Sequence, residues 1–148
     1  MTTDRHGMTV LETHECLALL RSTDVGRLAI AGADFPDIFP VNYVVDHGTV
    51  VFRTASGTKL AGLTDERRVT FEADGRTGDT AWSVVVKGYA VELRSMHDRV
   101  DALDLQVSPW HSSPKPHVVR IDPVEVTGRR FDTGVPVVVD RPRHVAIE

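Results

Sequence analysis

The residues best suited to chemistry lie in one short segment of this 148-residue chain, between positions 53 and 59. The segment combines two fixed positive charges with hydroxyl groups and a glycine: Arg53, Thr54, Ser56, Gly57, Thr58 and Lys59. Cationic side chains, hydroxyls and backbone N–H groups at the start of a helix are the groups that bind phosphate. The spacing predicts a candidate anion site, against the alternative of an exposed Arg and Lys without a specific role.

A hairpin and a helix are predicted to position this segment. Residues 38–45 and 49–54 are rich in β-branched and aromatic side chains, and the intervening Asp46-His47-Gly48 is typical of a tight turn. Ser56 then serves as a predicted N-cap for a helix over about residues 57–64. The candidate anion site would lie where the second strand leads into that helix.

The rest of the chain is predicted to consist mainly of strands joined by short connections. Helices are expected over residues 9–22 and, short and acidic, over residues 98–105. Further strands are expected over residues 25–31, 68–73, 82–93 and 118–131, with a polar loop at 74–80, a bulge at Gly88 and Pro123 at an edge or bulge. About six strands with only short helices predict a mainly β, barrel-like fold in one domain, with an ordered core over about residues 9–131 and a tail over 132–148.

Composition excludes several classes of protein. A formal net charge of −4 and a pI near 5.9 argue against a nucleic-acid binder, which needs a clustered basic face. No stretch has the character of a signal peptide or the length of a membrane span, so a soluble cytoplasmic protein is expected. Cys16 is the single cysteine, which excludes an intrachain disulfide and is expected to be a packing residue. The seven histidines show no helical pair at i and i+4, so no metal site is predicted.

Three motifs follow one another in a fixed order: PVNY at residues 40–43, FRTASGTKL at 52–60 and WSVVVKG at 82–88. Together they resemble the pyridoxamine 5′-phosphate oxidase-like proteins, which bind flavin in a split β-barrel. The resemblance extends from about residue 11 to 131 and implies a split β-barrel of about six strands that binds FMN. The C-terminal PRHVAIE does not match the segment that ends the true pyridoxamine phosphate oxidases, so the resemblance is to their shorter relatives.

The resemblance also implies which residues bind the cofactor. The strand at residues 40–43 would lie along the isoalloxazine ring and offer backbone hydrogen bonds to its polar edge, while Arg53 and Thr54 would lie at the phosphate and ribityl end. Ser83, preceded by Trp82, would reach the ring from a second subunit. The implied cofactor-binding residues are Pro40, Val41, Asn42, Tyr43, Arg53, Thr54, Gly57, Thr58, Lys59, Trp82 and Ser83.

The helix start completes the implied phosphate site. Gly57 permits close approach of the backbone to the phosphate. Thr58 and Lys59 match the basic pair that the family has at this helix start, with Thr58 in place of a second basic residue that many members carry.

The resemblance implies a homodimer with the cofactor at the subunit interface, acting as an FMN-dependent oxidoreductase on a small molecule. Two alternatives stay open. The same groove could take the deazaflavin F420, whose longer tail Arg27, Arg120, Arg129 and Arg130 could contact. The protein could also bind or carry flavin without catalysis. No catalytic residue is predicted, although His111 or His117 could supply a proton, and Trp110 could cover either a barrel end or the flavin.

Overall fold

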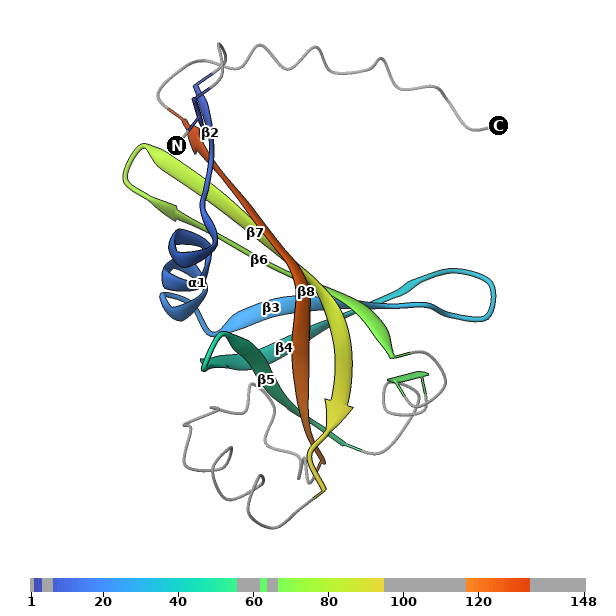
Figure 1. Ribbon diagram of the computed structural model, residues 1–148. Coiled ribbons are helices and arrows are strands. Elements are labelled where there is room, and N and C mark those ends of the chain that lie inside the picture. The colour runs from blue at the N-terminus through green and yellow to red at the C-terminus, as the bar shows by residue number, and fades with distance from the viewer. Residues whose placement is uncertain (1, 4–6, 56–61, 64–66, 95–116, 134–148) are drawn as a thin grey trace, which may run out of the picture.

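Eight strands and one helix make up the part of the chain that the computed structural model describes, which is residues 2–3, 7–55, 62–63, 67–94 and 117–133 (Figure 1). The helix is α1 (Thr13–Arg21). The strands are β1 (Thr2–Thr3), β2 (Met8–Val10), β3 (Val25–Ile30), β4 (Asp37–Asp46), β5 (Thr49–Thr54), β6 (Arg68–Thr77), β7 (Thr80–Glu92) and β8 (His117–Asp132).

Six of these strands close into an antiparallel barrel. Their order around the barrel is β8-β5-β4-β3-β6-β7, and the long pairing of β7 with β8 closes the ring. β8 crosses the whole barrel and continues beyond it to pair with β2, while α1 lies beside one end (Figure 1). The predicted mainly β barrel of about six strands is therefore confirmed.

The predicted hairpin forms from β4 and β5. His47 and Gly48 have φ angles of 48° and 78°, as a two-residue turn with two left-handed positions requires. The hydroxyl of Thr49 donates a hydrogen bond to the carbonyl of Asp46 at 2.6 Å and fastens the turn. The strand expected over residues 49–54 has the bounds of β5.

Alternating side chains along the strands fill the barrel. Phe52 and Phe71 are fully buried, and the ring of Phe71 meets that of Tyr43 edge to face, with centroids 4.8 Å apart. α1 covers one end of this core with Cys16 and Leu20, both without exposed surface. Cys16 is thus a packing residue, as its place in the sequence suggested.

Two predicted boundaries were wrong. The helix expected over residues 9–22 begins only at Thr13, because Met8–Val10 pair with β8 as a strand. The polar loop expected over residues 74–80 is mostly strand, because β6 continues to Thr77 in register with β7 and turns only at Gly78, whose φ is 58°. In both places pairing with a distant strand overrides the local sequence pattern.

The irregularities expected in the last two strands are confirmed. The register of β7 against β8 shifts between Lys87 and Gly88, and Pro123 lies opposite Gly88 where β8 pairs with β7 alone. A side chain at Gly88 would lie 2.1 Å from the carbonyl oxygen of Asp122, so the close approach requires glycine. The helix expected over residues 98–105, Trp110 and most of the tail lie outside the described residues.

Candidate functional site

The two halves of the predicted hairpin separate where the candidate site begins. β4 and β5 pair from Asp46–Thr49 to Tyr43–Phe52, and no β4–β5 pair is formed beyond this point among the described residues. Both strands continue: β4 runs back to Asp37 beside β3, while β5 runs on to Thr54 beside β8. The barrel is therefore split between residues 40–42 and residues 53–54, for which the family resemblance implies contacts with the ring and with the phosphate end of a cofactor.

Proline contributes to this split. Pro40 has no N–H with which to donate to a neighbouring strand, so it favours a strand edge. Pro40 pairs with Arg27 of β3, and no residue of β5 pairs with it among the described residues. The first predicted segment thus borders the split with backbone that β5 does not cover.

Arg53 occupies the opposite side of the split. It alternates with the buried Phe52 and therefore points away from the core, alongside Val51 and Val118 of a second apolar cluster. Its Nε is buried and has no hydrogen-bond partner among the described residues. A buried guanidinium nitrogen without a partner is costly, which makes this atom ready to receive an anion.

The side chains of residues 41–43 serve mainly structural roles. Val41 and Tyr43 are buried in the core, and the Tyr43 hydroxyl donates to the carbonyl of Leu20 at 2.6 Å. Burial raises the pKa of Tyr43. Asn42 donates to the carbonyl of Asp24 at 3.4 Å. What this strand offers a ligand at the split is its backbone and Pro40.

Trp82 and Ser83 lie on opposite faces of β7. The Trp82 ring is 4% exposed and packs in the core over Gly75, where an added Cβ would lie 2.7 Å from the indole nitrogen. Ser83 points outward between Asp74 and Arg129. β3 and β6 separate β7 from β4 around the barrel, roughly 14 Å at the usual strand spacing. On the other side of the barrel, Ser83 lies opposite Arg129 of β8 and Arg53 lies opposite Val118, far along the same strand, so Ser83 is not brought to the split within one chain.

An ion-pair network covers the strands between these two segments. Arg27 donates to Glu72 at 2.6 Å and to Asp74 at 2.8 Å. The hydrogen bond to Glu72 raises the pKa of Arg27. Arg27 lies opposite Pro40, and Asp74 lies opposite Ser83. The ion-pair network therefore lies on the outer surface of the barrel between the Pro40 segment of β4 and the Ser83 segment of β7.

The predicted helix start is only partly described. Gly57, Thr58 and Lys59 lie outside the described residues, and Gly62 and Leu63, which are described, are helical. Leu63 is buried against the core.

A polar cluster that sequence analysis missed lies at the same end of β5. His117, which begins β8 opposite Thr54, approaches Glu92 with its Nδ1 2.7 Å from Oε1. Arg94 approaches the other oxygen of Glu92 at 3.1 Å. The His117 hydrogen bond, and then Arg94, lower the pKa of Glu92 although burial acts in the opposite direction. His117 and Glu92 are 25 positions apart, so only the pairing of β7 with β8 reveals this contact.

Two hollows occur on the described surface. One, of about 440 Å³, lies over β3, β6 and β7 between Pro36, Tyr89 and Val124. The other, of about 310 Å³, is more polar and is lined by Leu63, Arg67, Ala90, Val91, Glu92, Arg94 and Val119; it is called here the barrel-end pocket. None of the predicted cofactor residues that are described lines either hollow.

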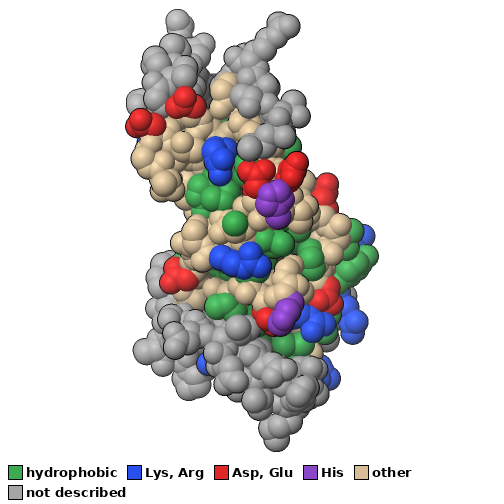
Figure 2. Space-filling model, turned by 60° about the vertical axis from the view of Figure 1, so that its left-hand side comes forward, with side chains coloured by type: hydrophobic (Ala, Val, Ile, Leu, Met, Phe, Trp, Pro, Cys, Tyr) green, Lys and Arg blue, Asp and Glu red, His purple; other side chains and the backbone are tan. Residues whose placement is uncertain are grey.

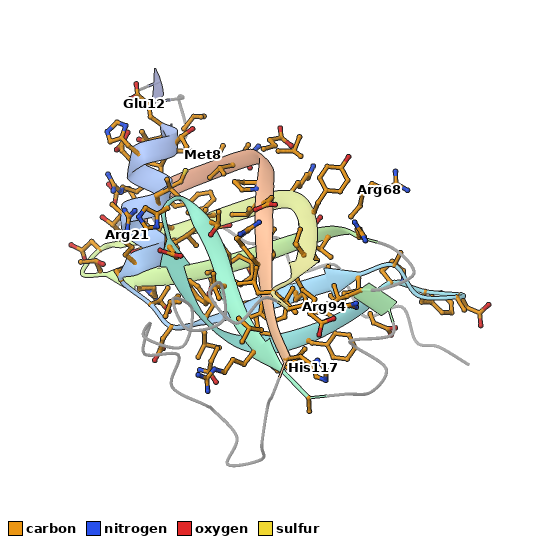
Figure 3. The ribbon with its side chains drawn as sticks, turned by 60° about the horizontal axis from the view of Figure 1, so that its bottom comes forward. Met8, Glu12, Arg21, Arg68, Arg94 and His117 are labelled. Carbon is orange, nitrogen blue, oxygen red and sulfur yellow. The ribbon has the colours of Figure 1, made fainter. Side chains whose placement is uncertain are left out.

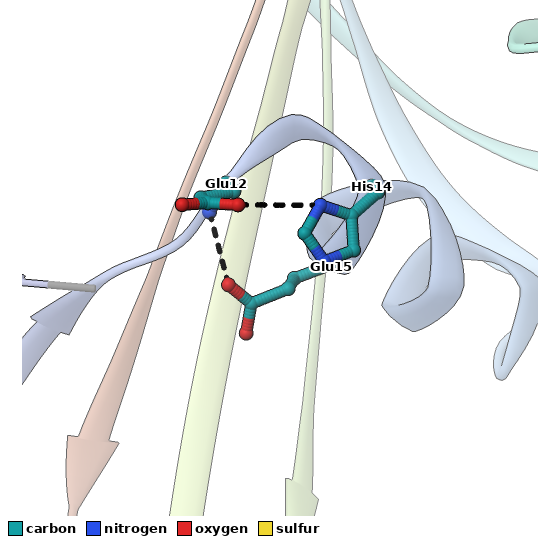
Figure 4. A group of neighbouring side chains, drawn as sticks. All are labelled: Glu12, His14 and Glu15. Atoms are coloured by element: carbon teal, nitrogen blue, oxygen red, sulfur yellow. Dashed lines mark hydrogen bonds and ion pairs between the residues drawn. The ribbon is translucent and has the colours of Figure 1, made fainter.

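Glu12, His14 and Glu15 bring ligand-type atoms within 4.8 Å of one another at the start of α1 (Figure 4). Their contacts are those of a helix cap: Glu15 accepts from the backbone N–H of Glu12 at 3.3 Å, and His14 lies 3.4 Å from Glu12. Capping therefore explains Glu12 and Glu15, and the contact with Glu12 explains His14.

On the face drawn in Figure 2, Lys and Arg side chains lie among acidic and hydrophobic ones. Within the described residues, no helix combines the length and the apolar character needed to cross a membrane.

Fold and site together define a split β-barrel protein with a candidate anion site at the split. The family model described as pyridoxamine 5′-phosphate oxidase matches residues 12–130, and the chain belongs to this family. The family membership that the three motifs led us to expect is confirmed.

Relatives agree with this assignment. Rv0080 of Mycobacterium tuberculosis, an uncharacterized protein, is 36% identical over 131 residues, covering 82% of this chain and 84% of its own. A Corynebacterium glutamicum structure is 39% identical, with a TM-score of 0.80 over 88% of this chain and 97% of its own. The FAD binding protein from Mycobacterium smegmatis is 39% identical, with a TM-score of 0.74 over 84% of this chain and 98% of its own.

Proposed function

We propose that this protein binds a flavin nucleotide at the split between β4 and β5 and acts as a flavin-dependent oxidoreductase on a small molecule. The observation that carries the proposal is the split itself, bordered by the backbone of residues 40–42 and by the buried Nε of Arg53, which has no hydrogen-bond partner within the described part of the chain. Family membership and the flavin-binding relative from M. smegmatis support the flavin. FMN is the cofactor proposed, with F420 as the alternative, while that relative adds FAD to the candidates.

The residues of the chain divide the work of binding. Arg53 would neutralise the phosphate, and Thr58 and Lys59 would add a hydroxyl and an ammonium group, while the buried side chain of Thr54 lies on the other face of β5. The strand at residues 40–42 would orient the ring by backbone hydrogen bonds, and Val41 and Tyr43 hold that strand rigidly by their burial. A bound flavin would supply the hydride or electron transfer, while the protein supplies position and electrostatics.

The proposal also includes a homodimer. Ser83 lies on β7, which β3 and β6 separate from β4, and neither of the two hollows described above is lined by both segments. A second copy could bring its Ser83 to the ring, with the cofactor held between the two subunits.

Identification of the cofactor tests the proposal first. Mass spectrometry of the small molecules released from the purified protein should find FMN; FAD or F420 would change the cofactor and keep the site. The apoprotein should then bind FMN with a dissociation constant at least tenfold lower than that of Arg53→Ala, since a charge-assisted phosphate contact contributes about 1.5–3 kcal/mol. Arg76→Ala, which removes an exposed arginine of β6, is the matched control. Equal affinities for the wild type and Arg53→Ala would refute the phosphate site.

A mixing experiment tests the shared site. Arg53→Ala and Ser83→Trp should each abolish tight binding alone. In a reassociated mixture the heterodimers would carry one site with both changes and one intact site, restoring about a quarter of the sites at equal amounts. If the mixture restores no binding sites, the shared site is refuted. Ser83 and Arg53 would then belong to a site within one subunit, or Ser83 would lie outside the site.

Turnover separates the enzyme from a flavin carrier. The loaded protein should reduce acceptors with NADH or NADPH faster than free FMN does. A rate equal to that of free flavin would show that the protein binds flavin but does not have this oxidoreductase activity.

A further inference from the structure

The larger of the two hollows is mostly apolar and lies on the outside of the barrel, over β3, β6 and β7 and between Pro36 and Val124. It is called here the apolar hollow. No residue of α1 lines it, and Figure 3 shows Arg68, which does line it, across the barrel from Arg21 at the end of α1. Hollows of about 300–1,000 Å³ hold small ligands, so one of about 440 Å³ has room for an aromatic side chain.

Exposed hydrophobic side chains gather at the apolar hollow. Among the described residues, six large hydrophobic side chains are exposed, and four of them lie in or beside this hollow: Phe35, Ile38, Tyr89 and Val124. Tyr89 and Val124 line it. Phe35 directly precedes Pro36 of its wall, and Ile38 pairs with Ala29, which also lines it. An apolar surface concentrated in this way is typical of a contact surface.

Phe35 presents its ring to solvent beside this surface. It is 81% exposed and does not line the hollow of its own chain. It lies in the connection between β3 and β4, residues 31–36, which projects from the barrel (Figure 1). A Cβ added at Gly32 would clash with the carbonyl oxygen of Phe35, so the connection folds tightly on itself. The chain therefore carries an aromatic side chain on a compact turn next to a hollow that has room for one.

The charges around the ring and the hollow are opposite in sign. Asp34 and Asp37 flank the Phe35–Pro36 pair and are exposed. Of the described residues that line the apolar hollow, two are cations, Arg68 and Lys87, and none is acidic. Lys87 lies 3.6 Å from Glu125, and both side chains are more than half exposed, so water weakens this pair. The acidic turn and the cationic hollow are thus complementary in charge.

We propose that a second copy of this chain occupies the apolar hollow, with the Phe35 ring of each copy inserted into the hollow of the other. The ring and the hollow lie side by side on one chain, because Phe35 is joined to Pro36 in the wall of the hollow. A two-fold axis between them therefore forms both contacts at once, as a self-complementary dimer interface requires. A different protein would have to supply the aromatic and acidic side chains that this chain already has.

The proposed contact surface adjoins the split. Ile38 and Pro40 are two positions apart in β4 and share its outer face, and Pro40 borders the split. A copy bound at the apolar hollow would lie beside the proposed cofactor site. In this respect the inference rests on the proposed function, to whose homodimer it gives a contact surface.

Sedimentation velocity of the full-length protein over a range of concentrations tests the proposal. The wild type should sediment as a dimer, and Phe35→Ala should raise its dissociation constant at least about tenfold, because each dimer loses two buried rings. Thr70→Trp, which fills the hollow from β6, should have the same effect. Phe131→Ala is the matched control, since it removes an exposed ring of β8 that does not line the hollow. Thermal unfolding verifies that each variant is folded.

A mixture of charge variants tests which surfaces meet. Asp34→Lys/Asp37→Lys reverses the charge of the turn, and Lys87→Glu reverses one charge of the hollow. Each variant alone should dimerise several-fold more weakly than the wild type. Mixed together they should associate more tightly than either alone, because a heterodimer joins the acidic turn of one copy to the unchanged hollow of the other. Arg76→Glu, at an exposed position of β6 outside the hollow, should not associate more tightly with the wild type than the wild type does with itself. A mixture that associates no more tightly than its components would contradict the contact between turn and hollow.

The failure of this inference is distinguishable from that of the proposed function. Equal dissociation constants for the wild type and Phe35→Ala overturn the contact surface and leave the proposed homodimer in place. A wild type that stays monomeric at every concentration overturns both. A Phe35→Ala protein that is monomeric and still binds FMN as tightly as the wild type supports the contact surface and refutes a cofactor site shared between subunits.

Discussion

Tyr43 and Phe52 form the last cross-strand pair before β4 and β5 diverge. Both side chains are buried in the barrel, so the split begins at a rigid point and not at a frayed end. The Tyr43 hydroxyl also reaches the last turn of α1 through the carbonyl of Leu20. One residue of the PVNY motif therefore links the helix, the core and the edge of the candidate site.

Removal of this link should destabilise the protein. Tyr43→Phe keeps the ring packing and leaves a buried carbonyl without its donor, so the free energy of unfolding should fall by about 1–2 kcal/mol. Chemical denaturation measures it. Tyr89→Phe is the control, because Tyr89 is 49% exposed and its loss should cost less than about 0.5 kcal/mol. Equal effects of the two changes would contradict the role of the Leu20 contact.

The bulge between β7 and β8 should tolerate no side chain at its glycine. In Gly88→Ala the new Cβ would meet the Asp122 carbonyl at 2.1 Å. Neither atom can rotate away, because the carbonyl belongs to the backbone and the Cβ is bonded directly to it. We expect a loss of about 2 kcal/mol or more from the overpacking. Gly78→Ala, at a turn with open space but a φ of 58°, should cost about 1 kcal/mol from backbone strain alone. Urea unfolding of the two variants measures both losses of unfolding free energy. A smaller loss for Gly88→Ala than for Gly78→Ala would show that β7 and β8 separate easily at the bulge.

The Glu92 cluster should make stability depend on pH in the acid range. The pKa of Glu92 is lowered in the folded protein from its ordinary 4.5, first by His117. The unfolded state therefore binds more protons in that range, so this stabilisation is present above pH 4.5 and is lost as the pH falls through the lower, folded pKa. The stability advantage of the wild type over Glu92→Gln should shrink below pH 4.5. Glu125→Gln, at an exposed carboxylate, is the control; a constant difference between wild type and Glu92→Gln would argue against the cluster.

The single thiol should be inert in the native protein. Cys16 has no exposed surface, and burial raises its pKa, which lowers the thiolate fraction. A disulfide reagent such as 5,5′-dithiobis(2-nitrobenzoate) should label it only after unfolding in denaturant. Complete labelling of native protein within minutes would show that α1 opens readily from the barrel end.

Local sequence was sufficient for much of the fold. The turn at His47–Gly48 and the strand that follows it depend on residues close in sequence, since turn geometry and side-chain alternation are local properties. Gly88 marked the bulge in the sequence, although the strand that it meets there is distant. Where the outcome depended on a distant partner, local reasoning failed. Residues 74–77 look like a loop and become strand only because β7 lies beside them.

The candidate site divides in the same way. The sequence by itself determined which residue types cluster at positions 53–59 and, through three ordered motifs, the family and the expected cofactor. Tertiary structure alone decided that β4 and β5 separate after Tyr43–Phe52, that the Arg53 Nε is buried without a partner among the described residues, and that His117 meets Glu92. These relationships depend on the order and register of strands around a closed barrel, and register is fixed by contacts between residues far apart in the chain.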